Sequence, residues 1–235
     1  MQLNTNSLIG FSLSATNGEV GKIEEIYFDD RNWVIRYLVV KTGNWLSGRK
    51  VLISPEAFDR ARWNDETFPV HLTKEQILNS PDVNTDRPLS SKHIASINKY
   101  FLWQTFIDDG FYAPAHCDLP DVTENAETDN QSEDHVHVRS TRQTKGFRIH
   151  AKDGEIGYVS DFIVSDEDWK MKYLVVAAKN IFGDRKILIS IRDIRETKWA
   201  SSDIYLDISV HAVEQSRIFD GSTFSDLEKM DPYFI

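Results

Sequence analysis

The sequence aligns with itself without a gap at a shift of 136 positions, and this internal repeat is the feature that most limits the possible folds. Gly10-Phe11 falls on Gly146-Phe147, and Tyr37-Leu38-Val39-Val40 falls on Tyr173-Leu174-Val175-Val176. About 20 positions are identical, and many others exchange one apolar residue for another. The period is longer than the roughly 20–50 residues of a solenoid unit. It therefore predicts two copies of a whole domain.

Each copy has the pattern of a short-stranded β domain. Asn17-Gly18 and Asp153-Gly154 are strong hairpin signals, because glycine supplies a positive φ or removes a Cβ where strands approach. In the first copy we expect strands at about 19–28, 34–41 and 50–53, and weaker ones at 60–63 and 68–72. The repeated signature residues are Gly10, Gly18, Gly21, Tyr37, Gly146, Gly154, Gly157 and Tyr173.

The expected fold is therefore mainly β. A sheet of five or six short strands buries a core best by closing on itself. We expect two small antiparallel β-barrels related by internal duplication. Short helices are expected between and after them, at about 73–78, 90–103 and 209–217. Thr73 and Gln76 have the spacing of a capping box at the start of the first helix.

The repeated motifs resemble a known family. Gly10-Phe11, Gly18-Glu19 and Gly21, then Tyr-Leu-Val-Val and a later Lys-x-Leu-Ile-Ser, are similar to the PRC-barrel domain. That domain occurs in the photosynthetic reaction-centre H subunit and in a ribosome maturation factor. The resemblance covers residues 5–72 and 141–208, and the whole pattern is similar to bacterial two-barrel proteins named after the H subunit. It implies a protein-docking or assembly module and not an enzyme.

Composition divides the rest of the chain. The expected segments are a first barrel with a short helix (1–80), an aromatic helical connector (81–117), an acidic flexible linker (118–145), a second barrel with a short helix (146–220) and a C-terminal tail (221–235). The net charge is -10, and residues 118–134 carry seven acids and no base. Such a segment buries too little apolar surface to offset its ordering entropy. Without a basic cluster, no nucleic-acid partner is expected.

Several residues are candidates for contacts with a partner protein. Trp33 and Trp169 follow an acidic turn at equivalent positions, and they are either anchors for a partner or caps of a barrel end. The basic pairs at equivalent positions either contact an acidic partner or lipid headgroups, or they are edge-strand charges that block unwanted strand pairing. The aromatic connector either packs on a barrel or offers a docking surface. The candidate contact residues are Trp33, Trp169, Arg49, Lys50, Arg185, Lys186 and Trp103.

The sequence contains no recognisable combination of catalytic residues. We expect no catalytic residues and no metal site, because no histidine is paired with a nucleophile and the carboxylates are scattered among turns. No cofactor is expected either, because the glycine pairs lead into strands and not into a helix N-terminus as a phosphate-binding loop would. His116, Cys117, His135 and His137 are expected to be ordinary linker residues, and the single cysteine precludes an intramolecular disulfide. No signal peptide or transmembrane helix is expected, so the default location is the cytoplasm; the resemblance implies a bacterial protein.

We predict that the protein is a non-enzymatic interaction or assembly module whose partner is unknown. Its partner could also be a second copy of the chain, which would give a homodimer. The alternative is a small-molecule, metal or lipid-responsive regulatory module that uses the cleft between the barrels. A groove lined by aromatic residues would favour the first hypothesis, and a pocket with clustered titratable groups would favour the second.

Overall fold

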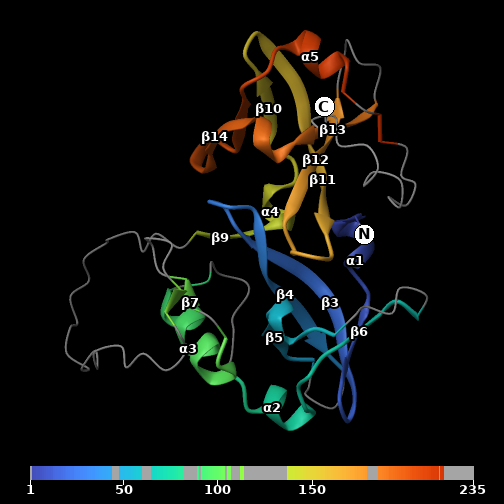
Figure 1. The fold of residues 1–235 in the computed structure, drawn as a ribbon, viewed down its shortest axis with the longest axis vertical. Coiled ribbons are helices and arrows are strands. Elements are labelled where there is room, and N and C mark those ends of the chain that lie inside the picture. The colour runs from blue at the N-terminus through green and yellow to red at the C-terminus, as the bar shows by residue number, and fades with distance from the viewer. Residues whose placement is uncertain are drawn as a thin grey trace, which may run out of the picture. The chain divides into compact units, whose positions relative to one another are not determined.

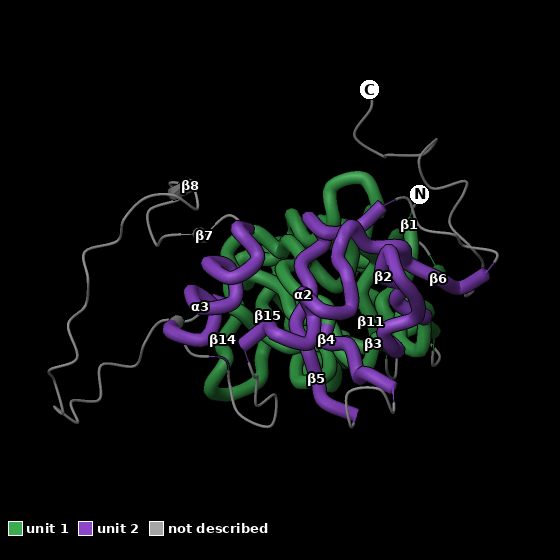
Figure 2. Tube along the Cα trace, turned by 90° about the horizontal axis from the view of Figure 1, so that it is seen from below, with its two compact units in different colours: residues 1–11, 23–38, 138–235 green, residues 12–22, 39–137 purple. Residues whose placement is uncertain are grey.

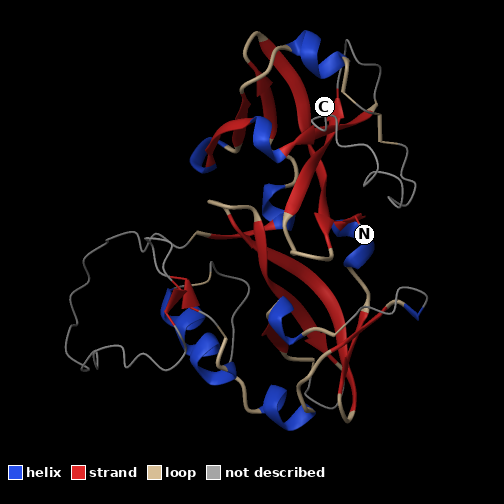
Figure 3. Cartoon of the chain, in the orientation of Figure 1, coloured by secondary structure: helices blue, strands red, loops and turns tan. Residues whose placement is uncertain are grey.

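In the computed structural model the described residues are 2–43, 48–59, 65–81, 89, 91–103, 105–106, 112–113, 137–178, 185–216 and 218–219. Strands dominate the described chain and its helices are short (Figure 3). The prediction of a mainly β fold is confirmed. The predicted strands at 60–63 lie outside the described residues, as do His116, Cys117 and His135.

The chain runs from β1 near the N-terminus to α5 in the second half (Figure 1), and the order β-α-β-β-β-β-η that begins the first half begins the second half as well. The first half contains β1 (Gln2–Asn4), α1 (Thr5–Leu8), β2 (Ser12–Ala15), β3 (Gly18–Asp29), β4 (Val34–Thr42), β5 (Lys50–Ile53), η2 (Pro55–Ala57), β6 (Thr67–Pro69), α2 (Lys74–Leu78), α3 (Ser91–Phe101), β7 (Thr105–Phe106) and β8 (Tyr112–Ala113). The second half contains β9 (Val138–Ser140), α4 (Thr141–Thr144), β10 (Arg148–Ala151), β11 (Gly154–Ser165), β12 (Met171–Ala178), β13 (Lys186–Ser190), η5 (Ile191–Asp193), β14 (Ile194–Lys198), η6 (Trp199–Ser201), β15 (Asp203–Leu206) and α5 (Val210–Glu214).

The strands form two larger sheets with matching orders. One has the order β5-β4-β3-β2-β6, and β9 also pairs with β3. The other has the order β13-β12-β11-β10-β15-β14, and β1 also pairs with β11. Strands β7 and β8 pair with each other. Each hairpin of long and short strands, β2 with β3 and β10 with β11, turns at the predicted Asn-Gly or Asp-Gly position.

The prediction of closed antiparallel barrels is wrong for the described residues. The first path ends at β5 and β6, the second ends at β13 and β14, and neither pair of ends is joined. Moreover, β2 pairs with β6 and β10 pairs with β15 in parallel. The long strands β3 and β11 extend past their hairpin partners. Strand β9 pairs with the extension of β3, and β1 pairs with the extension of β11. These pairings cover the exposed edges of the two extensions although neither sheet closes into a barrel.

These extra pairings are reciprocal. Asn4 lies opposite Ile163, and Ser140 lies opposite Tyr27, so each pair maps onto the other at the shift of 136. The turns that follow β3 and β11 repeat the relation. The Ile35 N–H donates to the Trp169 carbonyl at 2.8 Å, and the Met171 N–H donates to the Trp33 carbonyl at 2.8 Å.

A buried carboxylate anchors each of these crossing segments. Asp161 on β11 accepts hydrogen bonds from the Thr5 hydroxyl at 2.5 Å and the Asn6 N–H at 3.3 Å. Glu25, the equivalent residue on β3, accepts from the Ser140 hydroxyl and from Arg142 Nη2, the latter at 2.9 Å. Buried carboxylates are stable only when their oxygens are paired in this way. The short turns α1 and α4 are therefore tied to a strand more than a hundred residues away.

Two compact units share the chain. One comprises residues 1–11, 23–38 and 138–235, and the other comprises residues 12–22 and 39–137 (Figure 2). Both units thus draw on separated stretches of sequence, whereas the segments expected from composition are continuous. All of the reciprocal contacts described above lie within the first of these units.

The core of the first unit contains an aromatic group around Phe28. This side chain is fully buried. Its ring centroid lies 5.2 Å from that of Trp33, 5.9 Å from that of Phe162 and 6.4 Å from that of Trp199. Aromatic rings at these separations interact favourably beyond the area that they bury.

The predicted short helices are confirmed. In α2 the Thr73 hydroxyl accepts from the Gln76 N–H, and the Gln76 side chain accepts from the Thr73 N–H, which completes the capping box. Asn17 Oδ1 also accepts from the Lys74 N–H at 2.9 Å, and its equivalent Asp153 accepts from the Val210 N–H at 2.7 Å. Within the described ranges, none of the helices has the length and apolar character needed to cross a bilayer.

The signature glycines occupy two kinds of position. Gly10, Gly18 and Gly146 have positive φ values of 94°, 134° and 90°. Gly21 and Gly157 lie where two strands approach closely, because a Cβ there would lie 2.0 Å from the Lys41 carbonyl oxygen or 2.1 Å from that of Ala177. Glycine is thus required sterically at the latter two positions. At Gly154 a Cβ would lie 3.2 Å from a Val210 methyl carbon, which is a tight contact.

Candidate interaction surface

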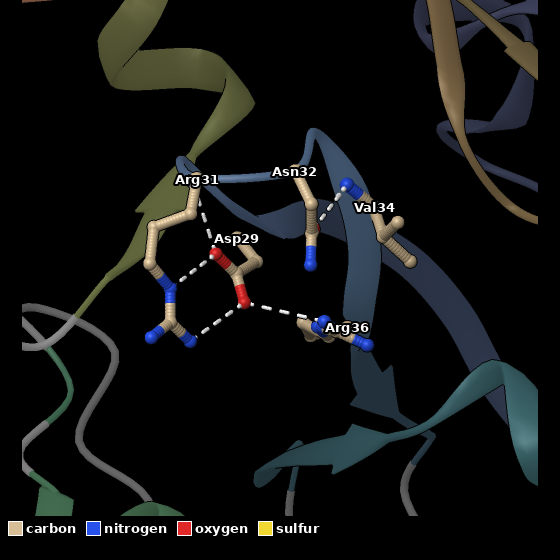
Figure 4. A network of polar contacts seen from close by, with 5 residues as sticks. All are labelled: Asp29, Arg31, Asn32, Val34 and Arg36. Atoms are coloured by element: carbon tan, nitrogen blue, oxygen red, sulfur yellow. Dashed lines mark hydrogen bonds and ion pairs between the residues drawn. The ribbon is translucent and has the colours of Figure 1, made fainter. Parts of the chain in front are cut away.

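The acidic turn before Trp33 is organised around the buried Asp29 carboxylate. Arg31 donates to it from its N–H at 3.0 Å and from Nε and Nη2, each at 3.2 Å, and Arg36 Nη2 donates at 3.2 Å (Figure 4). Asn32 Oδ1 accepts from the Val34 N–H at 3.1 Å on the other side of the turn. These bonds fix the chain so that Trp33 adopts a φ of 58°.

Burial of Asp29 would raise the pKa of its carboxyl, but the hydrogen bonds from Arg31 and the charges of Arg36 and Arg31 outweigh it and lower that pKa. Asp168, which corresponds to Asn32, repeats the turn. It accepts from the Lys170 N–H at 3.1 Å and from Lys172 Nζ at 2.6 Å. Burial opposes these bonds, yet the pKa of Asp168 is also lowered. The side-chain oxygens of Asp29 and Asn32 therefore fix the first turn, and the ionised carboxylate of Asp168 fixes the second. These side chains stabilise the turns.

The tryptophans proposed as partner anchors lie in different environments. Trp33 is buried and stacks on Phe28. Trp169 is half-buried and has a φ of 52°. Trp103 is buried and stacks on Phe101, with ring centroids 4.3 Å apart. Trp33 and Trp103 therefore support the interior, and of the three only Trp169 has substantial exposed area. Of the repeated tyrosines, Tyr37 is buried and Tyr173 packs half-buried against Ile163 and its neighbours.

The repeated basic pairs also differ. Arg49 is half-buried and donates to the Leu78 carbonyl at 3.1 Å, to the Pro81 carbonyl at 3.0 Å and to the Ser80 carbonyl. It thus caps the C-terminal end of α2, where carbonyl groups lack helical partners. Lys50 is half-buried, whereas Arg185 and Lys186 are exposed on the second sheet. The structure therefore gives Arg49 a role within the chain, and partner contacts by the other three stay a prediction.

Arg49 and Arg185 provide a matched pair of substitutions. Arg49→Gln removes a cation that binds several carbonyls, so we expect it to lower the free energy of unfolding by about 1–3 kcal/mol. Arg185→Gln removes the same charge at the equivalent exposed position, where we expect a change within about 0.5 kcal/mol. Urea unfolding followed by tryptophan fluorescence measures both. Equal effects of the two substitutions would contradict the capping role of Arg49.

A different part of the second sheet carries the most developed group of polar side chains on the side of the sheet opposite to its core. Along β10, Ile149 and Ala151 are buried, while Arg148 is exposed and His150 is half-buried. Strand β15 runs parallel to it; Ile204 and Leu206 are buried in the core, Tyr205 is half-buried, and Asp203 is buried beneath the side chains that bind it. This period-two alternation directs one set of side chains to the core and the other to the surface. We call the surface set the polar face: Arg148, His150, Arg195, Lys198, Asp203 and Tyr205.

Asp203 is the centre of one half of the polar face. Its carboxylate lies 2.8 Å from Arg148 Nε and 2.8 Å from His150 Nε2, and its second oxygen accepts from Arg148 Nη2 at 3.0 Å. Hydrogen bonds from Ser201 and His150, assisted by Arg148 against the effect of burial, lower the pKa of Asp203 from 3.8 to about 2. Asp203 is therefore ionised near neutral pH and orients both basic side chains.

Tyr205 is the centre of the other half. The His150 ring stacks on it with a centroid separation of 4.9 Å and an interplanar angle of 19°. Lys198 Nζ lies 4.8 Å from the Tyr205 ring centroid, and the Arg195 guanidinium carbon lies 5.9 Å from it. Two cations thus converge on one aromatic ring. These residues were not among the predicted contacts, because β10 and β15 pair across more than fifty residues of sequence. The alternation of polar and apolar residues in Arg148–Ala151 and Asp203–Leu206 was the available signal.

The low pKa of Asp203 predicts an acid-dependent loss of stability. The folded-state pKa lies below the unfolded value, so the ionised carboxylate stabilises the fold above about pH 3.8, and this contribution disappears as the pH falls through about 2. We expect the difference in unfolding free energy between the wild type and Asp203→Asn to shrink over that window. Chemical denaturation at a series of pH values measures it.

Asp193 supplies a control of opposite sign. Burial and the charge of Asp207 raise the pKa of Asp193, although a hydrogen bond from the Ser190 backbone acts against them. Ionisation of Asp193 therefore opposes folding, and relative to Asp193→Asn the wild type should lose stability as the pH rises above about 3.8. A pH-independent difference for Asp203→Asn would show that its carboxyl does not titrate as described.

No three His, Cys, Asp or Glu side chains of the described residues lie together as a metal site would require. His137, the one linker histidine among those residues, directly precedes β9. The titratable groups of the polar face are instead engaged with one another, as His150 and Arg148 are with Asp203.

The first part of the chain, from β1 to α2, is similar to a known domain family. This part is a small, mainly β segment built on the β2–β3 hairpin. Residues 2–76 match the family model of the PRC-barrel domain. The predicted resemblance is confirmed for this segment, which contains such a domain. No curated protein matches the chain.

Proposed function

We propose that the chain is a non-enzymatic interaction or assembly module that arose by duplication of a PRC-like domain and acts in the bacterial cytoplasm. The match over residues 2–76 supports the first repeat. Support for the second comes from the strand order β13-β12-β11-β10-β15, which corresponds to β5-β4-β3-β2-β6, and from the pairs Asn4–Ile163 and Tyr27–Ser140, which the same shift relates. The cytoplasmic and bacterial setting rests on the resemblance to two-repeat bacterial proteins.

The observation that carries the proposed function is the polar face. It combines cations, a tyrosine and a histidine on the outer side of a sheet whose inner side is packed with Ile149, Ile204 and Leu206. Interfaces are enriched in tyrosine and arginine, and a sheet holds such residues in a fixed arrangement. Catalysis would instead need a nucleophile or acid within reach of an unengaged base. On the polar face, His150 is already bonded to Asp203 and stacked on Tyr205.

Quantitative affinity capture tests this proposal. The tagged full chain serves as bait in a lysate of the source organism, at low and at high salt, and the tag alone serves as control. We expect a partner that is recovered reciprocally and that forms a complex of defined stoichiometry with the purified chain by light scattering. A homodimer is a second supporting outcome. Failure to form any stoichiometric complex, together with turnover of a metabolite by the purified chain, would overturn the proposal.

A further inference from the structure

Strand β14 lies at the end of its sheet and carries charged side chains. It pairs with β15 on one side, with Glu196 opposite Tyr205 and Lys198 opposite Asp203. Among the described residues no strand pairs with its other side. At the opposite end of the sheet, β13 does have a neighbour, because Ile218 forms a bridge with Ile187 and the Phe219 N–H donates to the Lys186 carbonyl at 2.7 Å. The exposed edge of β14 can therefore accept an added strand.

The charges beside this edge are not balanced. The side chains of Arg195 and Lys198 both approach the Tyr205 ring, which brings two positive groups to one small area. Two of the nearby carboxylates are engaged elsewhere. Asp203 binds Arg148 and His150, and Asp207 binds Lys152 Nζ at 2.8 Å.

Two acids reduce this positive charge in part. Arg195 is close enough to Asp207 to help the Lys152 hydrogen bond and charge lower the pKa of that carboxyl. Glu196 is exposed on the same strand. An additional anionic group placed between Arg195 and Lys198 would still relieve their mutual repulsion, because neither has an ion-pair partner at 4.0 Å or less among the described salt bridges.

We propose that β14 is a docking strand for an extended, carboxylate-rich peptide segment of a partner protein. The peptide backbone pairs with the outer edge of β14, and its acidic side chains meet Arg195 and Lys198 beside Tyr205. A peptide satisfies the main-chain groups of a strand edge, which phosphate or a nucleic acid does not. The net charge of -10 also disfavours long polyanions. The proposal rests on the proposed function, since it specifies the chemistry of the partner and the place where it docks.

Fluorescence anisotropy at low salt tests the docking strand directly. The probe is a labelled ten-residue peptide of alternating Glu and Thr, titrated with the full chain. We expect saturable binding that Arg195→Gln combined with Lys198→Gln weakens about tenfold or more. The matched control is Lys22→Gln combined with Lys41→Gln, which removes the same charge from exposed positions on β3 and β4 and should change the affinity less than about twofold. Circular dichroism establishes that all variants are folded.

Two further probes separate strand addition from simple charge attraction. The same peptide N-methylated at every second residue cannot extend a ladder and should bind about tenfold more weakly. Inorganic polyphosphate should compete poorly. Equal binding by both double variants, equal binding by the N-methylated peptide, efficient competition by polyphosphate or no binding of the acidic peptide would each overturn the docking strand. None of these results would affect a stoichiometric complex found by capture, so failure here is distinguishable from failure of the proposed function.

A third outcome concerns the alternative role of the edge charges. If Arg195 and Lys198 serve only to prevent strand pairing between copies, the double variant will self-associate and the wild type will not bind the peptide. Light scattering of the variant at increasing protein concentration measures this. We expect the variant to keep the oligomeric state of the wild type.

Discussion

Gly157→Ala is expected to destabilise the protein by more than about 4 kcal/mol, enough to unfold most of a marginally stable chain. The new Cβ would lie 2.1 Å from the Ala177 carbonyl oxygen. The atom it meets belongs to the backbone of β12, so no side-chain rotation can relieve the clash. The strands β11 and β12 would have to separate, with loss of ladder hydrogen bonds. Urea unfolding monitored by circular dichroism measures the effect, and Gly21→Ala should behave alike.

Gly146→Ala is the matched control. Its Cβ would have no atom within 4 Å, and the cost is that of a left-handed backbone at a φ of 90°, about 1–2 kcal/mol. If Gly157→Ala cost no more than Gly146→Ala, the close approach of β11 and β12 would be contradicted.

Phe28→Ala is expected to lower the free energy of unfolding by about 3–5 kcal/mol. Phe28 is fully buried among Trp33, Phe162 and Trp199, and truncation leaves a cavity that these rings cannot fill by small movements. Differential scanning calorimetry or urea unfolding measures the loss. The near-ultraviolet circular dichroism of the two tryptophans should weaken as well, because their packing is loosened.

Phe28→Leu separates the aromatic contribution from volume. It keeps most of the buried volume, so we expect a loss of no more than about 1.5 kcal/mol. A cost below about 1 kcal/mol for Phe28→Ala would mean that this group is not part of a packed core.

Local patterns predicted the local structure well. Strand 50–53 was expected at those bounds, β3 is longer than expected by one residue at each end, and β4 is longer by one residue at its C-terminal end. The capping box at Thr73 and Gln76 formed as its spacing indicated. These elements depend on turn chemistry and side-chain alternation over a few residues, which a single sequence records.

Non-local features could not be predicted in the same way. Gln2–Asn4 and Val138–Ser140 are short and half-polar, and they become strands because β11 and β3 offer them an edge. We predicted closed barrels because exposed strand edges must be protected. In the structure, the added strands β1 and β9 protect part of these edges by pairing with β11 and β3. The polar face could not be assembled either, since Arg148 and Asp203 become neighbours only through a parallel pairing.

The exposure of single side chains also depended on context. Arg49 and Arg185 occupy equivalent positions, yet Arg49 binds the carbonyls of Leu78 and Pro81 while Arg185 is exposed. Trp33 and Trp169 differ similarly in burial. Equivalent positions of the two repeats therefore share a backbone conformation, such as the positive φ of both tryptophans, but their side chains differ in burial and in contacts.

The reciprocal pairing has a consequence for the order of folding events. Leu3 acquires its partner Val164 only after most of the chain has been synthesised, and Phe28 likewise waits for Arg139. Contacts of such high sequence separation slow folding, because the chain loses the entropy of loop closure before these contacts stabilise it. On the ribosome, β1 and the extension of β3 therefore emerge long before their partners. A nascent chain halted before residue 138 would expose both, and a chaperone that binds unpaired strands would find them there.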